Sequence, residues 1–209
     1  MRYNRFFKDN NWLTPTTYTQ ELSEYAVGLK YEDLPPEVIE RAKMIMLQTI
    51  GVALAAKDTP IAQKARKMAL EANGGEGGPT TLWGTGEKLA SVNAALAAGT
   101  LADALDWEDC SWTGHPSAGI IPCAWLAAEE KHKSGKELLT AIVAAYEVYQ
   151  RIAMAVQPTD EIWKTKGWGL TSWQIFGCIL SVAKLYDFDA RKINQAIGVG
   201  CESSTLPTD

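Results

Sequence analysis

The sequence predicts an all-α protein: a mostly helical, bundle-like domain with at most one short extended segment. Three observations lead to this prediction. Apolar side chains recur at helical spacing along most of the 209-residue chain. Ser, Thr, Asp or Pro, which favour helix N-termini, stand where these periodic stretches begin. The sequence shows neither strand-like runs at a spacing of about 8–12 residues nor βαβ alternation, which excludes sandwiches and doubly wound sheets.

The chain divides into a short arm and one domain. Residues 1–16 are polar and aromatic and show no period, so we expect an N-terminal arm that packs on another surface or stays loose. Residues 17–209 carry the helical pattern, and their number is sufficient for one large domain. The sequence has no repeat of fixed period that would indicate a solenoid.

Three helices are expected before the extended segment. The first begins at Thr17, because a hydroxyl at the N-cap and Gln20 three residues later have the spacing of a capping box. The second and third begin at Pro36 and Pro60, since proline suits the first turn of a helix. Helical spacing places four side chains of the third helix toward the core, namely Ala62, Ala65, Met68 and Ala69.

One extended segment and five further helices follow. Residues 80–83, Thr-Thr-Leu-Trp, are the only convincing extended stretch, and glycine-rich turns flank them. The helix expected over Ser91–Leu105 is rich in alanine, which allows close contact between helices. The other four helices are expected at residues 116–131, 134–152, 171–186 and from 189 onward.

Composition and charge narrow the range of functions. A net charge of −5, from 20 basic and 25 acidic residues, does not suit a binder of nucleic-acid backbones, so we expect no nucleic-acid partner. The N-terminus is not leader-like and no apolar run approaches a membrane span, so we expect a cytoplasmic protein without a membrane partner. The scattered cysteines and histidines show no metal-ligand spacing, and we therefore expect no metal site.

The densest group of reactive side chains is an acidic stretch followed by a histidine. Four carboxylates fall within residues 103–109, at the end of an apolar helix where the helix dipole disfavours negative charge. His115 follows, just before the helix that starts at Pro116. The amides of that helix would hold the imidazole toward its neutral form, in which it can act as a general base. The alternative is a solvated loop in which His115 or Ser117 only caps the helix.

A second motif combines lysines with a glycine turn. Lys164 and Lys166 precede Gly167-Trp168-Gly169 and the hydroxyl of Thr171. Such a turn exposes backbone N–H groups and, with the lysines, suits a carboxylate or a phosphate. The alternative is an ordinary helix start with Thr171 as the N-cap.

The remaining motifs favour structural roles. Glu147 and Arg151 have the spacing of an ion pair on one helix. Tyr146 and Tyr149 belong to the same helix and are expected in the core. His132 follows charged residues at a helix end, where it is expected at the surface and complements the dipole.

Several motifs together resemble the MmgE/PrpD family. The most specific is the stretch from Asn93 to Asp109 followed by His115-Pro116-Ser117. Residues 134–151, with Ser-Gly-Lys-Glu at their start, are similar to the next family motif. The similarity extends from about Thr17 to Cys201, and its other segments are residues 29–38, 41–53 and 82–86.

The resemblance implies a fold and a chemistry. The family includes 2-methylcitrate dehydratase, cis-aconitate decarboxylase and iminodisuccinate epimerase, which need no cofactor and act on small di- and tricarboxylates. Its members are homodimers with a large helical domain and a smaller α/β lid domain, and the active site lies between the two domains. The resemblance places an acidic site residue at Asp106 and a catalytic histidine at His115.

These implications lead to a hypothesis for the site. Proton removal beside a carboxylate needs a base and cationic groups. We assign the acid/base role to His115, and Asp106 would orient or tune it. Five further residues are expected to bind the carboxylate substrate or complete its site, namely Lys164, Lys166, Thr171, Ser117 and Asp109.

The chain departs from the family pattern in two respects. Gly169 stands at or beside the position where many members carry a second histidine, which leaves the substrate open. The resemblance also covers only the first part of the helical domain and not the lid. We therefore expect one half of a split or truncated lyase or isomerase, as a homodimer or with a second chain that supplies the lid. The alternative is a non-catalytic helical scaffold or carboxylate-binding subunit.

Overall fold

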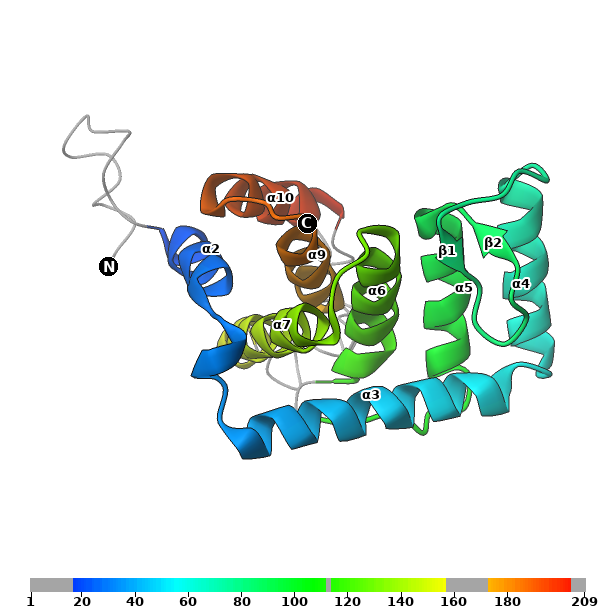
Figure 1. Cartoon of the computed structure of the whole chain (residues 1–209), viewed down its shortest axis with the longest axis horizontal. Coiled ribbons are helices and arrows are strands. Elements are labelled where there is room, and N and C mark those ends of the chain that lie inside the picture. Colours follow the sequence, from blue (N-terminus) through cyan, green and yellow to red (C-terminus); the bar gives the residue numbers. More distant parts are fainter. Residues whose placement is uncertain (1–16, 112–113, 157–172, 204–209) are drawn as a thin grey trace, which may run out of the picture.

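The computed structural model describes residues 17–111, 114–156 and 173–203, which are helical apart from one small hairpin and the connecting loops (Figure 1). The predicted all-α class is confirmed. None of the helices in these ranges has the length and apolar character that crossing a membrane requires. The elements are α2 (Tyr18–Gly28), the 3-10 helix η1 (Tyr31–Asp33), α3 (Pro36–Ala56), α4 (Pro60–Ala72), β1 (Thr80–Thr81), β2 (Lys88–Leu89), α5 (Ser91–Asp103), α6 (Pro116–Glu130), α7 (Gly135–Val156), α9 (Gln174–Leu185) and α10 (Ala190–Ser203).

The helix starts follow the chemistry that the sequence indicates. Thr17 Oγ1 accepts a hydrogen bond from the backbone N–H of Gln20 (3.1 Å). The side chain of Gln20 donates to Glu24 instead of completing the capping box. Pro36 and Pro60 occupy the first turns of α3 and α4, as expected, and relieve those turns of an unpaired N–H group.

A two-stranded hairpin interrupts the helices. β1 and β2 pair antiparallel, with Thr80 opposite Leu89 and Thr81 opposite Lys88. The sequence predicts the first strand, within residues 80–83, but not the second, because two residues are too few to show an alternating pattern. The buried hydroxyl of Thr80 donates to the carbonyl oxygen of Leu89 (2.9 Å), which fixes the register.

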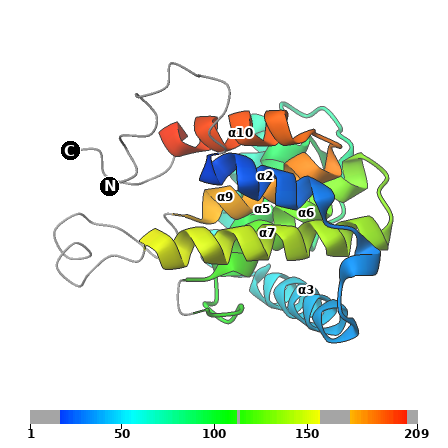
Figure 2. The same ribbon diagram turned by 90° about the vertical axis from the view of Figure 1, so that its left-hand side faces the viewer.

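The helices form two packed groups that meet at α6. The first group packs α5 against α4, α6 and the hairpin, and α3 runs beneath it along the lower edge of Figure 1. In the second group α2, α7, α9 and α10 lie together (Figure 2), and the buried side chains of Tyr149 and Trp173 belong to the core that they share. The indole Nε1 of Trp173 donates to the hydroxyl of Tyr149 (3.1 Å), so the largest buried side chains also carry a polar contact. As expected from their size, four of the five alanines of α5 are buried, namely Ala94, Ala97, Ala98 and Ala102.

One core assignment is wrong. Ala62, Ala65 and Ala69 of α4 are buried, but the side chain of Met68 is 49% exposed. α4 lies at the edge of the molecule and packs mainly against α5, so its buried stripe is narrow and Met68 falls outside it (Figure 1). Three structural expectations are confirmed, namely the Glu147–Arg151 ion pair (3.1 Å), the buried Tyr149 and the exposed His132.

Gly177 determines how closely α9 approaches α6. A Cβ at this position would lie 2.5 Å from Cδ1 and 2.7 Å from Cγ1 of Ile120. We expect Gly177→Ala to lower the free energy of unfolding by about 1 kcal/mol, because overpacking outweighs the gain in helix propensity. At Gly198 of α10 an added Cβ would meet no described atom within 4 Å, so Gly198→Ala should raise this free energy by about 0.5–1 kcal/mol. Urea unfolding measures the free energy of both variants. If the two substitutions change it in the same direction, the close approach of Gly177 to Ile120 is contradicted.

Candidate functional site

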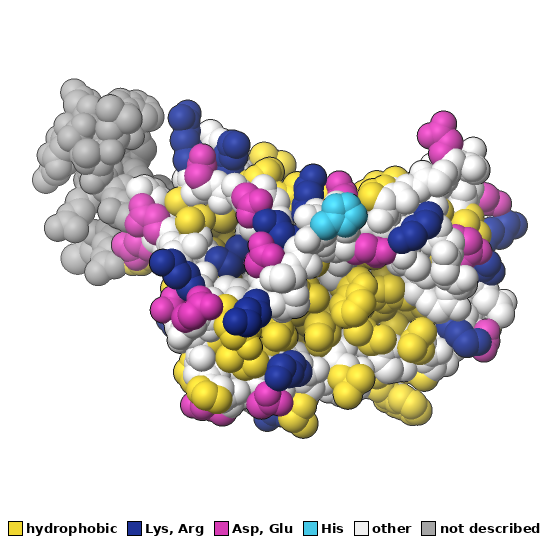
Figure 3. Space-filling view, viewed as in Figure 1, with side chains coloured by type: hydrophobic (Ala, Val, Ile, Leu, Met, Phe, Trp, Pro, Cys, Tyr) yellow, Lys and Arg dark blue, Asp and Glu magenta, His cyan; other side chains and the backbone are white. Residues whose placement is uncertain are grey.

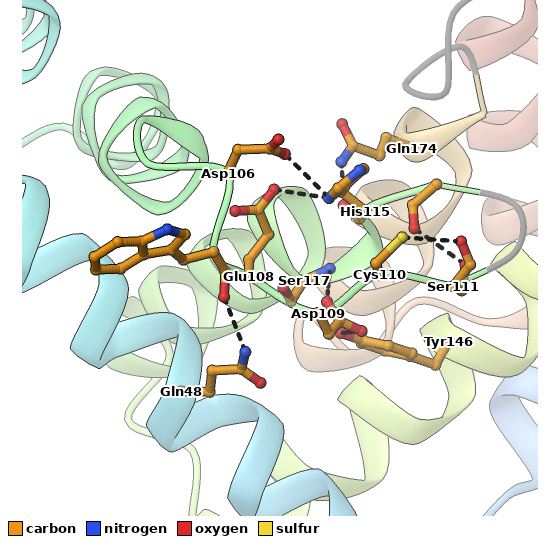
Figure 4. A network of polar contacts seen from close by, with 12 residues as sticks. Gln48, Asp106, Glu108, Asp109, Cys110, Ser111, His115, Ser117, Tyr146 and Gln174 are labelled. Carbon is orange, nitrogen blue, oxygen red and sulfur yellow. Dashed lines mark hydrogen bonds and ion pairs between the residues drawn. The ribbon is translucent and has the colours of Figure 1, made fainter.

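The loop between α5 and α6 brings His115 together with two carboxylates (Figure 4). His115 is the N-cap residue of α6, and its Nδ1 lies 3.0 Å from Oε1 of Glu108 and 3.7 Å from Oδ1 of Asp106. Asp106 has a φ of 52°, in the left-handed region, where the chain turns after α5. The structure thus brings the predicted pair of Asp106 and His115 together, and it places Glu108 closer to the imidazole than Asp106.

The two carboxylates differ sharply in exposure. The side chain of Glu108 is fully buried, whereas that of Asp106 is 84% exposed. Burial raises the pKa of Glu108, and the neighbouring Asp103 carboxylate raises it further, while a charged His115 acts in the opposite direction. The interpretation of this stretch as a solvated loop is therefore correct for Asp106 but wrong for Glu108.

Asp109 connects the loop to α6 and α7. Its Oδ1 accepts a hydrogen bond from the backbone N–H of Ser117 (3.0 Å), and its Oδ2 accepts one from the hydroxyl of Tyr146 (3.2 Å). Burial and then the charge of Asp109 raise the pKa of Tyr146, so the phenol remains the donor. Ser117 is itself fully buried. Asp109 and Ser117 thus hold the loop on α6, and their part in substrate binding stays a prediction.

Two glutamines from distant helices hold the backbone of the loop. Gln48 of α3 donates through Nε2 to the carbonyl oxygen of Trp107 (2.9 Å). Gln174 of α9 donates through Nε2 to the carbonyl oxygen of His115. Each glutamine is 59 residues from its partner in the sequence, so no local pattern could reveal these contacts. They restrain the loop on both sides of Glu108.

Part of the predicted site lies outside the described residues. Lys164, Lys166, Gly169 and Thr171 fall within residues 157–172, so their roles in binding carboxylates stay predictions. The described chain resumes at Trp173, and the next residue, Gln174, contacts His115.

One group of side chains in the described ranges has the geometry to hold a metal ion. Ligand atoms of Asp106, Glu108 and His115 lie within 4.8 Å of one another. Carboxylates and an imidazole are common ligands of divalent cations. A cation bound through Nδ1 needs that nitrogen unprotonated, whereas a hydrogen bond from Nδ1 to Glu108 needs it protonated. The two arrangements therefore exclude each other at His115.

A large apolar hollow occupies a different surface. Its volume is about 940 Å³, and α3, α6 and the turn after β1 contribute Leu54, Trp125 and Trp83 to its lining. Figure 3 shows apolar side chains gathered on this face, above α3. Trp83 and Trp125 meet edge to face with their ring centroids 6.2 Å apart. His115 and its carboxylates do not line this hollow, and exposed apolar faces of this kind are typical of contact surfaces.

Because burial raises the pKa of Glu108, we expect this carboxylate to destabilise the fold at neutral pH. Folded Glu108 keeps its proton at higher pH than the unfolded chain does. Stability is therefore lost as the pH rises from the ordinary glutamate value of 4.5 through the raised pKa. Glu108→Gln carries no charge and should raise Tm at pH 7.5 by about 2–4 °C, as roughly 1 kcal/mol does in a chain of this size.

Thermal unfolding at two pH values measures this effect. At pH 4 the glutamate of the wild type is largely protonated and, like the glutamine of the variant, carries little charge. The difference in Tm between Glu108→Gln and the wild type should therefore shrink toward zero. Asp106→Asn removes the exposed carboxylate and should leave Tm nearly unchanged at both pH values. A lower Tm for Glu108→Gln at pH 7.5 would show that the ion pair with His115 outweighs the cost of burial.

Comparisons with known proteins identify relatives of this chain. The family model for the MmgE/PrpD N-terminal domain matches residues 20–207. The cis-aconitate decarboxylase-like protein oryM of Aspergillus oryzae is 27% identical over 195 residues, which cover 88% of this chain and 39% of that protein. The cis-aconitate decarboxylase of Aspergillus terreus is 24% identical over 193 residues, which cover 88% of this chain and 38% of that protein. The cis-aconitate decarboxylase of Homo sapiens is 27% identical over 141 residues, which cover 64% of this chain and 29% of that protein. The chain thus spans less than two fifths of the length of these relatives.

Proposed function

This chain belongs to the MmgE/PrpD family, and on that premise we propose that it takes part in a lyase or isomerase reaction on a small di- or tricarboxylate, by acid/base proton transfer at His115. The observation that carries the proposal is the contact of the His115 imidazole with a buried carboxylate at 3.0 Å, at the start of α6. A histidine held in this way can accept and return a proton near neutral pH. Matched relatives named as cis-aconitate decarboxylases support a carboxylate substrate.

The proposed step moves a proton between the substrate and His115. In dehydration or epimerisation, the imidazole takes the proton from a carbon next to a carboxylate. The electron pair left on carbon then expels hydroxide or takes a proton back on the other face. In decarboxylation, the C–C bond breaks to release CO₂, and the electron pair takes a proton from protonated His115. Lys164 and Lys166 are proposed to offset the substrate charge in either case.

We further propose that the site is completed by a second copy of this chain, or by another chain or segment that supplies the lid, in the cytoplasm. Two observations support this proposal. The chain spans less than two fifths of the length of these relatives. The hollow lined by Trp83 and Trp125 is an apolar surface to which another chain or segment could bind. Native mass spectrometry of the complex from the host tests it. A stoichiometric partner with a lid-like sequence supports a split enzyme, and a homodimer without activity supports a scaffold.

Proton exchange is the most direct test of the reaction class. The protein, with any chain that co-purifies, is incubated in D₂O with cis-aconitate and other small di- and tricarboxylates. We expect ¹H NMR to show loss of a C–H signal next to a carboxylate, or formation of product, for at least one of them. Binding of carboxylates without exchange would favour the carboxylate-binding subunit. If the protein shows no exchange and also binds none of these carboxylates, both functions are contradicted.

A further inference from the structure

Glu108 has the position of a residue that controls the histidine. Its side chain is fully buried, and Oε1 lies 3.0 Å from Nδ1 of His115. This contact falls outside ordinary hydrogen-bond geometry, and neither oxygen of Glu108 nor Nδ1 of His115 makes a hydrogen bond of that geometry to any other described residue. A buried carboxylate without a donor is costly, so the proton on Nδ1 is the group in the described structure that best satisfies it.

We infer that Glu108 is a positioning residue for His115. Its buried carboxylate accepts a hydrogen bond from Nδ1–H when the ring turns toward it, which leaves Nε2 as the unprotonated nitrogen that reacts. In Figure 4 the second ring nitrogen of His115 points away from both carboxylates. A neutral imidazole carries one proton, and the hydrogen bond that one nitrogen makes decides which nitrogen holds it. The inference deepens the proposed function and rests on it for its catalytic meaning.

Asp106 is less suited to this role. Its side chain is 84% exposed and its nearest oxygen lies 3.7 Å from Nδ1, so water competes with the contact and weakens it. The contacts of the backbone also favour Glu108 over Asp106 as the residue that positions His115. Gln48 holds the carbonyl oxygen of Trp107, the residue before Glu108, and Gln174 holds that of His115. The backbone is therefore held next to Glu108 and at the partly exposed His115 itself.

Nitrogen NMR of the imidazoles tests the inference without a substrate. The chain has two histidines, so ¹⁵N–¹H long-range spectra at pH 8.5 contain only His115 and the exposed His132 as an internal reference. We expect His115 to be protonated mainly on Nδ1 and His132 mainly on Nε2, the form that free imidazole side chains favour. Glu108→Leu cannot accept a hydrogen bond, and it should change the tautomer ratio of His115 at least about fivefold toward Nε2–H. Asp106→Asn is the matched control and should leave the ratio unchanged.

The wild-type spectrum alone can overturn the inference, since a His115 protonated mainly on Nε2 excludes it. An unchanged ratio in folded Glu108→Leu would also overturn it. If Glu108→Leu does not fold, Glu108→Asp replaces it, and its shorter side chain should shift the ratio in the same direction but less. Because these spectra need no turnover, the inference can hold even where the proton-exchange assay finds no substrate.

An active preparation adds a second readout. Glu108→Leu should lower kcat about 10–100-fold with little change in KM, the typical effect of losing the residue that orients a reacting histidine. Glu108→Asp should recover part of kcat. A rise in KM at unchanged kcat would assign Glu108 to substrate binding and would contradict a positioning role.

Discussion

Replacing His115 with alanine is expected to lower the rate of substrate proton exchange at least about a hundredfold, the usual contribution of a positioned acid/base group. The expectation rests on the geometry of the site. His115 is the histidine at the start of α6, and its imidazole contacts a buried carboxylate at 3.0 Å. No other imidazole among the described residues could take over, because His132 lies exposed on the surface. Exchange is followed by ¹H NMR in D₂O with the carboxylate that the wild type turns over fastest.

His132→Ala is the matched control for this variant. It removes the same chemical group from an exposed position and should keep the wild-type rate within about twofold. Circular dichroism of both variants shows whether the fold is retained, since His115 also ends the loop that Gln174 restrains. A loss below tenfold in folded His115→Ala would remove this residue from the acid/base role, and the proposed reaction would need another base.

The helical scaffold could be predicted because its signals are local. Thr17 and Pro36 mark helix starts through chemistry that acts within a single turn. The strand β2 and the exposure of Met68 could not be predicted in the same way. Two residues show no period, and the burial of Met68 depends on α4 lying at the edge of the molecule, which is a property of the tertiary structure.

The candidate site could be predicted only in part. The acidic stretch and His115 are neighbours in the sequence, so their clustering follows from the loop that joins two helices. The sequence does not reveal which carboxylate is buried, because Asp106 and Glu108 are only two residues apart and chemically alike. The positive φ of Asp106 and the hydrogen bond from Gln48 to the next residue, Trp107, help to fix the course of this loop. That hydrogen bond depends on a helix 59 residues away.

Substitution of Gly78 is expected to have the largest effect on stability. Its backbone passes so close to β2 that an added Cβ would overlap the carbonyl group of Leu89 and the nitrogen of Ala90. Neither group can move freely. Thr80 donates to the Leu89 carbonyl oxygen (2.9 Å), and the Ala90 N–H donates to Asn73 (2.8 Å). We expect Gly78→Ala to lower the free energy of unfolding by about 2–4 kcal/mol, because backbone must shift beside a buried leucine.

Gly77→Ala separates this close approach from the general effect of removing a glycine. An added Cβ at Gly77 would meet no described atom within 4 Å, and neither glycine has a positive φ. Gly77→Ala should therefore change the free energy of unfolding by less than about 0.5 kcal/mol, or raise it slightly through the unfolded chain. Urea unfolding of the two neighbouring variants gives the comparison directly. Equal urea midpoints for the two variants would mean that the hairpin backbone can shift without loss of stability. The pairing of Thr80 with Leu89 would then contribute little to the stability of the domain.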